Sequence, residues 1–82
     1  MNWYKVEEND AYKRITGKLF IVATKHRVLG GINYFIAKPV FRWEDWWWQD
    51  INDNTFMYVR EDDLYAIFSP LSFLRGEEHG RA

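Results

Sequence analysis

The side chains with the most distinctive chemistry in this sequence are four tryptophans within six positions, Trp43 and Trp46–Trp48, which lie among carboxylates. Each indole can bury on the order of 200 Å² of surface and offers an electron-rich face to cations. Exposed tryptophans are preferred anchors of protein interfaces, and aromatic grooves beside acids bind basic or proline-rich peptides and methylated ammonium groups. An exposed aromatic surface rimmed by acids is therefore one interpretation of this segment.

The other interpretation places these rings in the core, and it applies first to Trp43 and Trp47, because aromatic residues supply much of the buried surface of a small domain. In a helix, Trp48 would lie off the face that its neighbours share with Ile51. In a strand, Trp46 and Trp48 would share one face, with Trp47 on the other beside Trp43. Either geometry leaves at least one indole off the main apolar face. The candidate partner-binding residues are Trp46, Trp48, Glu44, Asp45, Asp50, Glu61, Asp62 and Asp63.

The charge of the chain is divided unevenly. Residues 1–42 hold eight Lys or Arg and three acids, whereas residues 43–82 hold three Arg and nine acids, so the net charge of −1 combines a basic and an acidic half. Charge runs of this kind are commonly solvated faces of opposite sign. The alternative is an acidic binding face over residues 44–63, which would accelerate association with a basic partner.

The basic half contains a second candidate surface, which would bind nucleic acid. Its cations would contact phosphates while Tyr34 and Phe35, which are interleaved with them, stack on bases. The net charge of −1 and the isoelectric point near 6.1 argue against this hypothesis, since dedicated nucleic-acid-binding domains are usually basic. The candidate residues are Lys25, Arg27, Lys38 and Arg42.

The residue types that catalysis or metal binding requires are not combined anywhere in the chain. There is no Cys, and the two histidines, His26 and His79, have no second ligand at metal-binding spacing. Ser69 and Ser72 flank a Pro-Leu pair without the glycines that expose a nucleophile. Gly30-Gly31 lacks the Lys-Ser/Thr of a phosphate-binding loop. We therefore expect no enzyme, no catalytic residues, no metal and no cofactor.

Composition limits the class of protein. With five Trp, five Tyr and six Phe, aromatic residues make up 20% of the 82 residues, which excludes a disordered chain. The absence of Cys excludes a disulfide scaffold, and the longest apolar run, Leu19–Ala23, is far shorter than the roughly 18–20 residues of a membrane span. The first residues do not read as a signal peptide. We expect a cytoplasmic single domain of residues 1–75, followed by a flexible tail, 76–82.

The elements that would position these residues are mainly strands. Residues 18–24 form a continuous apolar run, which predicts a strand covered on both faces and hence central. Residues 32–43 alternate with period two, and the glycines at 30 and 31 predict a tight turn, so 18–28 and 32–42 should form a hairpin. Pro39 cannot donate to a ladder, which predicts an edge or a bulge at its position.

The remaining segments are less uniform. Residues 55–60 predict a further strand after the turn residues 52–54. Residues 62–68 fit both a helix and a strand, and we favour a short strand or a single turn. Near the N-terminus, residues 2–7 fit a strand and residues 11–15 fit a short helix capped by Asn9 or Asp10.

The expected fold is mainly β or α+β, either a small antiparallel sheet or an SH3-like or OB-like barrel of about four or five strands with one short helix. By analogy, such folds mostly bind rather than catalyse. The first hypothesis is a small non-enzymatic protein-binding module that uses an aromatic and acidic face to hold a basic protein or peptide. The alternatives are an inhibitor of the kind made by phages and mobile elements, which blocks a host enzyme through acids 44–63, and a nucleic-acid-binding domain that uses the basic hairpin.

Overall fold

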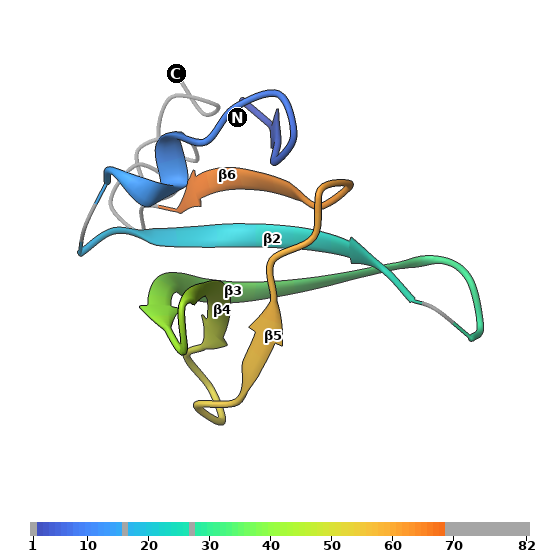
Figure 1. The fold of residues 1–82 in the computed structure, drawn as a ribbon. Helices are drawn as coiled ribbons and strands as arrows, with labels where there is room; N and C mark the ends of the chain where they lie inside the picture. The colour runs from blue at the N-terminus through green and yellow to red at the C-terminus, as the bar shows by residue number, and fades with distance from the viewer. Residues whose placement is uncertain (1, 16, 27, 69–82) are drawn as a thin grey trace, which may run out of the picture.

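The computed structural model describes residues 2–15, 17–26 and 28–68. They form six antiparallel strands in one open sheet with almost no helix, in the order β1-β6-β2-β3-β4-β5 (Figure 1). The elements are β1 Tyr4–Lys5, the 3₁₀ helix η1 Ala11–Lys13, β2 Leu19–Lys25, β3 Ile32–Arg42, β4 Asp45–Asp50, β5 Phe56–Tyr58 and β6 Leu64–Phe68. The expected small antiparallel sheet is confirmed, with more strands than expected because the tryptophan segment and the two-residue β1 both join it. The expected domain boundary at 75 and the tail 76–82 lie outside the described residues.

The centre of the sheet is the predicted hairpin of β2 and β3. Its turn places Gly30 and Gly31 at φ 71° and 77°, in the left-handed region that glycine adopts without strain. β2 pairs with β3 on one side and β6 on the other, which confirms its central position. The ladder between β2 and β3 ends at Ala37, and beyond it Pro39 pairs only with β4. Pro39, which has no backbone N–H, therefore lies where β3 has only one neighbouring strand, and this agrees with the edge position predicted for it.

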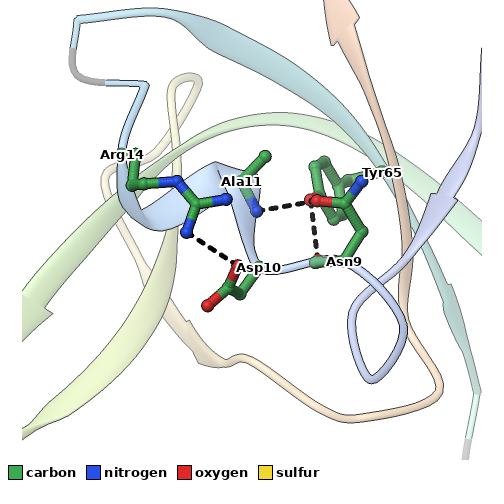
Figure 2. A network of polar contacts seen from close by, with 5 residues as sticks. All are labelled: Asn9, Asp10, Ala11, Arg14 and Tyr65. Atoms are coloured by element: carbon green, nitrogen blue, oxygen red, sulfur yellow. Dashed lines mark hydrogen bonds and ion pairs between the residues drawn. The ribbon is translucent and has the colours of Figure 1, made fainter.

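The ambiguous segments take strand and short helical forms. Residues 62–68 contain the strand β6, which the pairing with β2 stabilises, and β5 is shorter than the predicted 55–60. Both N-terminal interpretations hold in shortened form, as β1 and η1. The backbone N–H of Ala11 donates to Asn9 Oδ1 at 2.8 Å, whereas Asp10 pairs with Arg14 at 3.0 Å on the surface (Figure 2). Asn9, rather than Asp10, therefore satisfies the start of the helix, and its backbone oxygen also accepts the Tyr65 hydroxyl at 2.8 Å (Figure 2).

The core lies on one face of a strongly curved sheet, which we call the inner face. Phe20, Trp48 and Tyr65 are fully buried there, and Tyr12 of η1 packs over them. The Trp48 ring is 5.9 Å from that of Tyr65, although β4 and β6 are three places apart in the sheet. In a flat sheet these strands would lie about 14 Å apart. The sheet therefore curls around the inner face, and the chain leaving β5 returns across it to reach β6 (Figure 1).

A buried carboxylate connects the elements of this core. Asp63, immediately before β6, is 1% exposed. It accepts hydrogen bonds from Thr24 Oγ1 of β2 at 2.6 Å, from Trp48 Nε1 of β4 at 3.0 Å and from the backbone N–H of Arg60 at 2.8 Å. One side chain therefore satisfies two buried donors and one part-buried donor, and each of them would cost free energy if left without a partner.

We predict that Asp63→Ala lowers the free energy of unfolding by about 3–5 kcal/mol, because it leaves the Thr24 hydroxyl, the Trp48 indole N–H and the Arg60 N–H without their acceptor. Urea unfolding would measure the change. The matched control is Asp62→Ala, whose carboxylate is exposed and forms only a surface ion pair with Arg60 at 3.7 Å, and it should cost less than about 1 kcal/mol. Equal losses in the two variants would contradict a central role for Asp63.

Alkaline pH should destabilise the fold through its buried tyrosines. Burial raises the pKa of Tyr12 and of Tyr65 above the ordinary value of 10.0. The folded protein then holds these protons to a higher pH than the unfolded chain, so stability is complete below about pH 10 and falls as pH rises through the raised pKa values. Unfolding free energies measured between about pH 8 and 11 should show a shallower loss for Tyr12→Phe than for the wild type. Identical slopes would show that the Tyr12 phenol does not contribute.

Candidate interaction surface

The tryptophan segment is a strand, and its alternation separates the indoles. β4 pairs with β3 and β5, and it directs Trp46 and Trp48 to the inner face. Trp47 points to the opposite, outer face, where its ring contacts Trp43. The expectation that Trp43 and Trp47 belong to the core is wrong for Trp43, which is 67% exposed, and Trp47 is half-buried. Trp47 is turned away from the core because the register between β4 and β3 aligns Trp48 with Pro39 and places Trp48 over Phe20.

Two of the candidate partner-binding residues are not on the surface. Trp48 is completely buried and Asp63 is 1% exposed, and the two are hydrogen-bonded to each other. The expectation that they belong to an exposed face is therefore corrected: burying the indole requires an acceptor for its N–H, and Asp63 supplies it. Trp46 is half-buried, with its ring 5.7 Å from that of Tyr12 and 5.4 Å from that of Phe41.

The acids of β4 lie at its two ends. Glu44 is exposed in the turn between β3 and β4, and Asp45 accepts a hydrogen bond from the Tyr58 hydroxyl at 2.8 Å. This hydrogen bond raises the pKa of Tyr58 above its ordinary value. Asp50 stands at the other end of the strand, about 16 Å away, and accepts the N–H of Asn52.

The other candidate acids lie at the far edge of the sheet. Glu61 and Asp62 are exposed in the connection from β5 to β6. The Glu61 carbonyl accepts the N–H of Glu7 just after β1, and Asp62 pairs with Arg60. Asp45 and Asp50 stand at opposite ends of β4, while Glu61 and Asp62 lie beside the residue that follows β1, so the candidate acids are distributed over separate elements.

The basic candidates share one face of the sheet. The strand registers place Lys25, Lys38 and Arg42 on the outer face, and all three are exposed. Lys25 is paired with Ile32, so Lys38 lies about 20 Å further along β3. Tyr34 is also exposed on this face, whereas the alternation turns Phe35 to the inner face; Arg27 lies outside the described residues.

An exposed aromatic cluster that no sequence pattern predicted occupies the outer face of β3, β4 and β5. We define the aromatic patch as Arg42, Trp43, Trp47, Phe56 and Tyr58. Edge-to-face contacts join Trp43 to Trp47 at 5.8 Å, Trp43 to Phe56 at 5.7 Å, and Trp47 to Tyr58 at 5.3 Å. The Arg42 guanidinium lies over the Trp43 ring at 4.9 Å and the Phe56 ring at 5.5 Å. The pairing of Trp43 with Trp47 followed from strand alternation, but bringing Phe56 and Tyr58 beside them required the register between β4 and β5.

The turn that carries Trp43 is strained. Arg42 pairs with Asp45, so Trp43 and Glu44 form a two-residue loop, with φ of 52° and 62°. Positive φ at both positions is the geometry of a type I′ turn, which favours Asn-Gly and costs other residues roughly 1–2 kcal/mol each. Contacts that hold the turn include the Trp47 Nε1–H, which donates to the Arg42 carbonyl at 2.9 Å. Strain of this kind persists where the surroundings impose it, and it concentrates at functional sites.

Three further findings complete the description. Within residues 2–15, 17–26 and 28–68, no three histidine or acidic side chains come together as a metal site would need. The same residues include no helix with the length and apolar character to cross a bilayer. Comparisons with models of protein families, with curated proteins and with solved structures gave no match.

We predict that Glu44→Gly raises the free energy of unfolding by about 1 kcal/mol, because glycine adopts a positive φ without strain and the Trp43 side chain is retained. Thermal or urea unfolding would measure the gain. Glu61→Gly is the matched control, since Glu61 is exposed and outside the positive-φ positions, and it should be neutral or destabilising by up to about 1 kcal/mol. A loss of stability in Glu44→Gly would show that the turn is not strained at this residue.

Proposed function

We propose that this protein is a non-enzymatic module that binds a protein partner through the aromatic patch. The observation that carries the proposal is Trp43, whose large indole is 67% exposed in a turn with a positive φ that glycine would adopt without strain. An exposed tryptophan is a preferred anchor of protein interfaces, and backbone strain concentrates at functional sites. The two features together at Trp43 support contact with a partner.

The composition of the patch supports a protein partner. Trp, Tyr and Arg are the residue types most enriched among the side chains that dominate protein-binding energies. The patch holds two Trp, one Tyr and one Arg, with Phe56 beside them. Its rings are held by one another, so little conformational freedom would be lost on binding.

Charge narrows the partner's chemistry. Arg42 is exposed and stacked on Trp43 and Phe56, which leaves its N–H groups available to a carboxylate. Two acids, Glu44 and Asp45, stand next to the patch in the sequence. The Asp45 carboxylate already accepts a hydrogen bond from the Tyr58 hydroxyl. We therefore propose a partner that presents apolar side chains to the rings and a carboxylate to Arg42, in place of the basic partner suggested by the sequence. The inhibitor hypothesis needs acids 44–63 on one surface, and their distribution gives it no support.

Catalysis is not part of the proposal. The His26 Nδ1 accepts the backbone N–H groups of Val28 at 3.3 Å and Leu29 at 3.1 Å, so this imidazole serves the hairpin turn. We also propose a cytoplasmic location, because a domain without cysteine does not depend on the disulfide bonds that form in oxidising compartments.

Binding to single-stranded nucleic acid is the second candidate, because the outer face of the strands carries Lys25, Lys38 and Arg42 together with exposed aromatic rings. The two candidates differ in their response to salt and to loss of a lysine. Nucleic-acid binding would weaken steeply with added salt, and Lys38→Gln would reduce that salt dependence. Binding through the patch rings would respond weakly to both.

The test compares capture by the immobilised wild type with capture by Trp43→Ala, from lysate treated with nuclease. A specific partner should be retained by the wild type and lost with Trp43→Ala, and the purified partner should bind this variant about 30-fold more weakly or worse. Trp3→Ala is the matched control, because Trp3 is also exposed but contacts Tyr34, outside the patch. Equal capture by wild type and Trp43→Ala would contradict the proposal. Loss of all capture after nuclease treatment would favour nucleic acid.

A further inference from the structure

A hollow separate from the aromatic patch lies between η1 and the second half of β3. Its volume is about 360 Å³, within the range of roughly 300–1,000 Å³ that small-molecule sites occupy. Its walls are apolar and come from Tyr12, Ile15, Pro39, Val40, Phe41 and Trp46. None of these residues belongs to the patch, so the two surfaces can be tested independently.

The aromatic walls of this hollow are incompletely covered. Phe41 is 58% exposed although its ring contacts that of Trp46 at 5.4 Å, and Trp46 itself is half-buried. Tyr12 also lines the hollow, with its ring 5.7 Å from that of Trp46. A ligand with an apolar body would remove this ring surface from water, which is the main source of affinity in small sites.

Two lysines border the hollow, Lys13 from η1 and Lys38 from β3. Lys38 belongs to the outer face, but it stands beyond the last residue that pairs with β2, where residues of both faces of β3 line the hollow. The ion pairs of the described residues join Lys5 to Glu7, Arg14 to Asp10 and Arg60 to Asp62, so neither lysine takes part in one. Among the described residues, those that line the hollow include no acid. Apolar walls with two ammonium groups beside them are complementary to a molecule that is apolar at one end and anionic at the other.

We propose that this hollow binds a small amphipathic carboxylate, with an aromatic or branched aliphatic body against Phe41 and Trp46 and the carboxylate between Lys13 and Lys38. The site needs no metal and no covalent step. It shares no residue with the aromatic patch, and Lys38 is the residue that it has in common with the surface of the nucleic-acid candidate.

The probe for the test is 3-phenylpropionate, with its neutral amide, 3-phenylpropanamide, as the matched ligand. Amide and indole N–H chemical shifts of the isotope-labelled protein would be followed during titration to millimolar concentrations. The carboxylate should shift the resonances of Tyr12, Phe41 and the Trp46 indole, and it should bind about fivefold tighter than the amide or better. Equal binding of the two ligands, absence of binding, or shifts confined to other residues would overturn the proposal.

Lysine variants test the placement of the carboxylate. Lys13→Gln and Lys38→Gln should each weaken 3-phenylpropionate about two- to fivefold and leave the amide unchanged. Lys25→Gln, a change of the same kind at an exposed lysine outside this hollow, should have no effect, and neither should Trp43→Ala. All of these side chains are exposed, and unchanged spectra elsewhere would confirm an intact fold. If Lys25→Gln weakens the probe as much as the two site variants, only general electrostatic attraction is present and the site is refuted.

Discussion

The rest of the structure depends on the hydrogen bonds of the buried Asp63 carboxylate. It joins β2 through Thr24, β4 through Trp48, and the connection before β6 through the Arg60 N–H. Its own backbone carbonyl accepts the N–H of Val6, which follows β1. A fully buried indole needs an acceptor for its N–H. Asp63 therefore allows Trp48, the largest of the fully buried side chains, to fill the centre of a curved sheet, and the same bonds hold the neighbouring segments around it.

The burial of Trp48 determines which aromatic side chains are left exposed. Once Trp48 is buried, the period of two along β4 sends Trp47 outward, and the turn before it leaves Trp43 exposed. Phe41, two residues before Trp43 on β3, is likewise left partly uncovered beside the hollow. A chain of 82 residues with 20% aromatic content has more ring surface than its small core can enclose. The excess is gathered into the patch and the hollow, where it can serve binding.

Much of the fold was predictable because it depends on local rules. The continuous apolar run at 18–24, the two glycines at 30 and 31 and the alternation of 32–43 each specify a strand or turn without reference to distant residues. Pro39 likewise predicted a position with one neighbouring strand. Residues 62–68 were ambiguous because their spacing suits both helix and strand, and only the ladder with β2 selects the strand.

By itself, the sequence determined a cysteine-free, aromatic-rich β domain, its central hairpin, and the separation of Trp46 and Trp48 from Trp47 in a strand. Which side of that strand faces the core was decided only in the tertiary structure, because the choice depends on the register between β3 and β4. The same holds for Asp63, whose sequence neighbours make it look like one more surface acid. Its burial results from donors that the fold brings from residues 15 and 39 positions away, and no local pattern encodes such contacts.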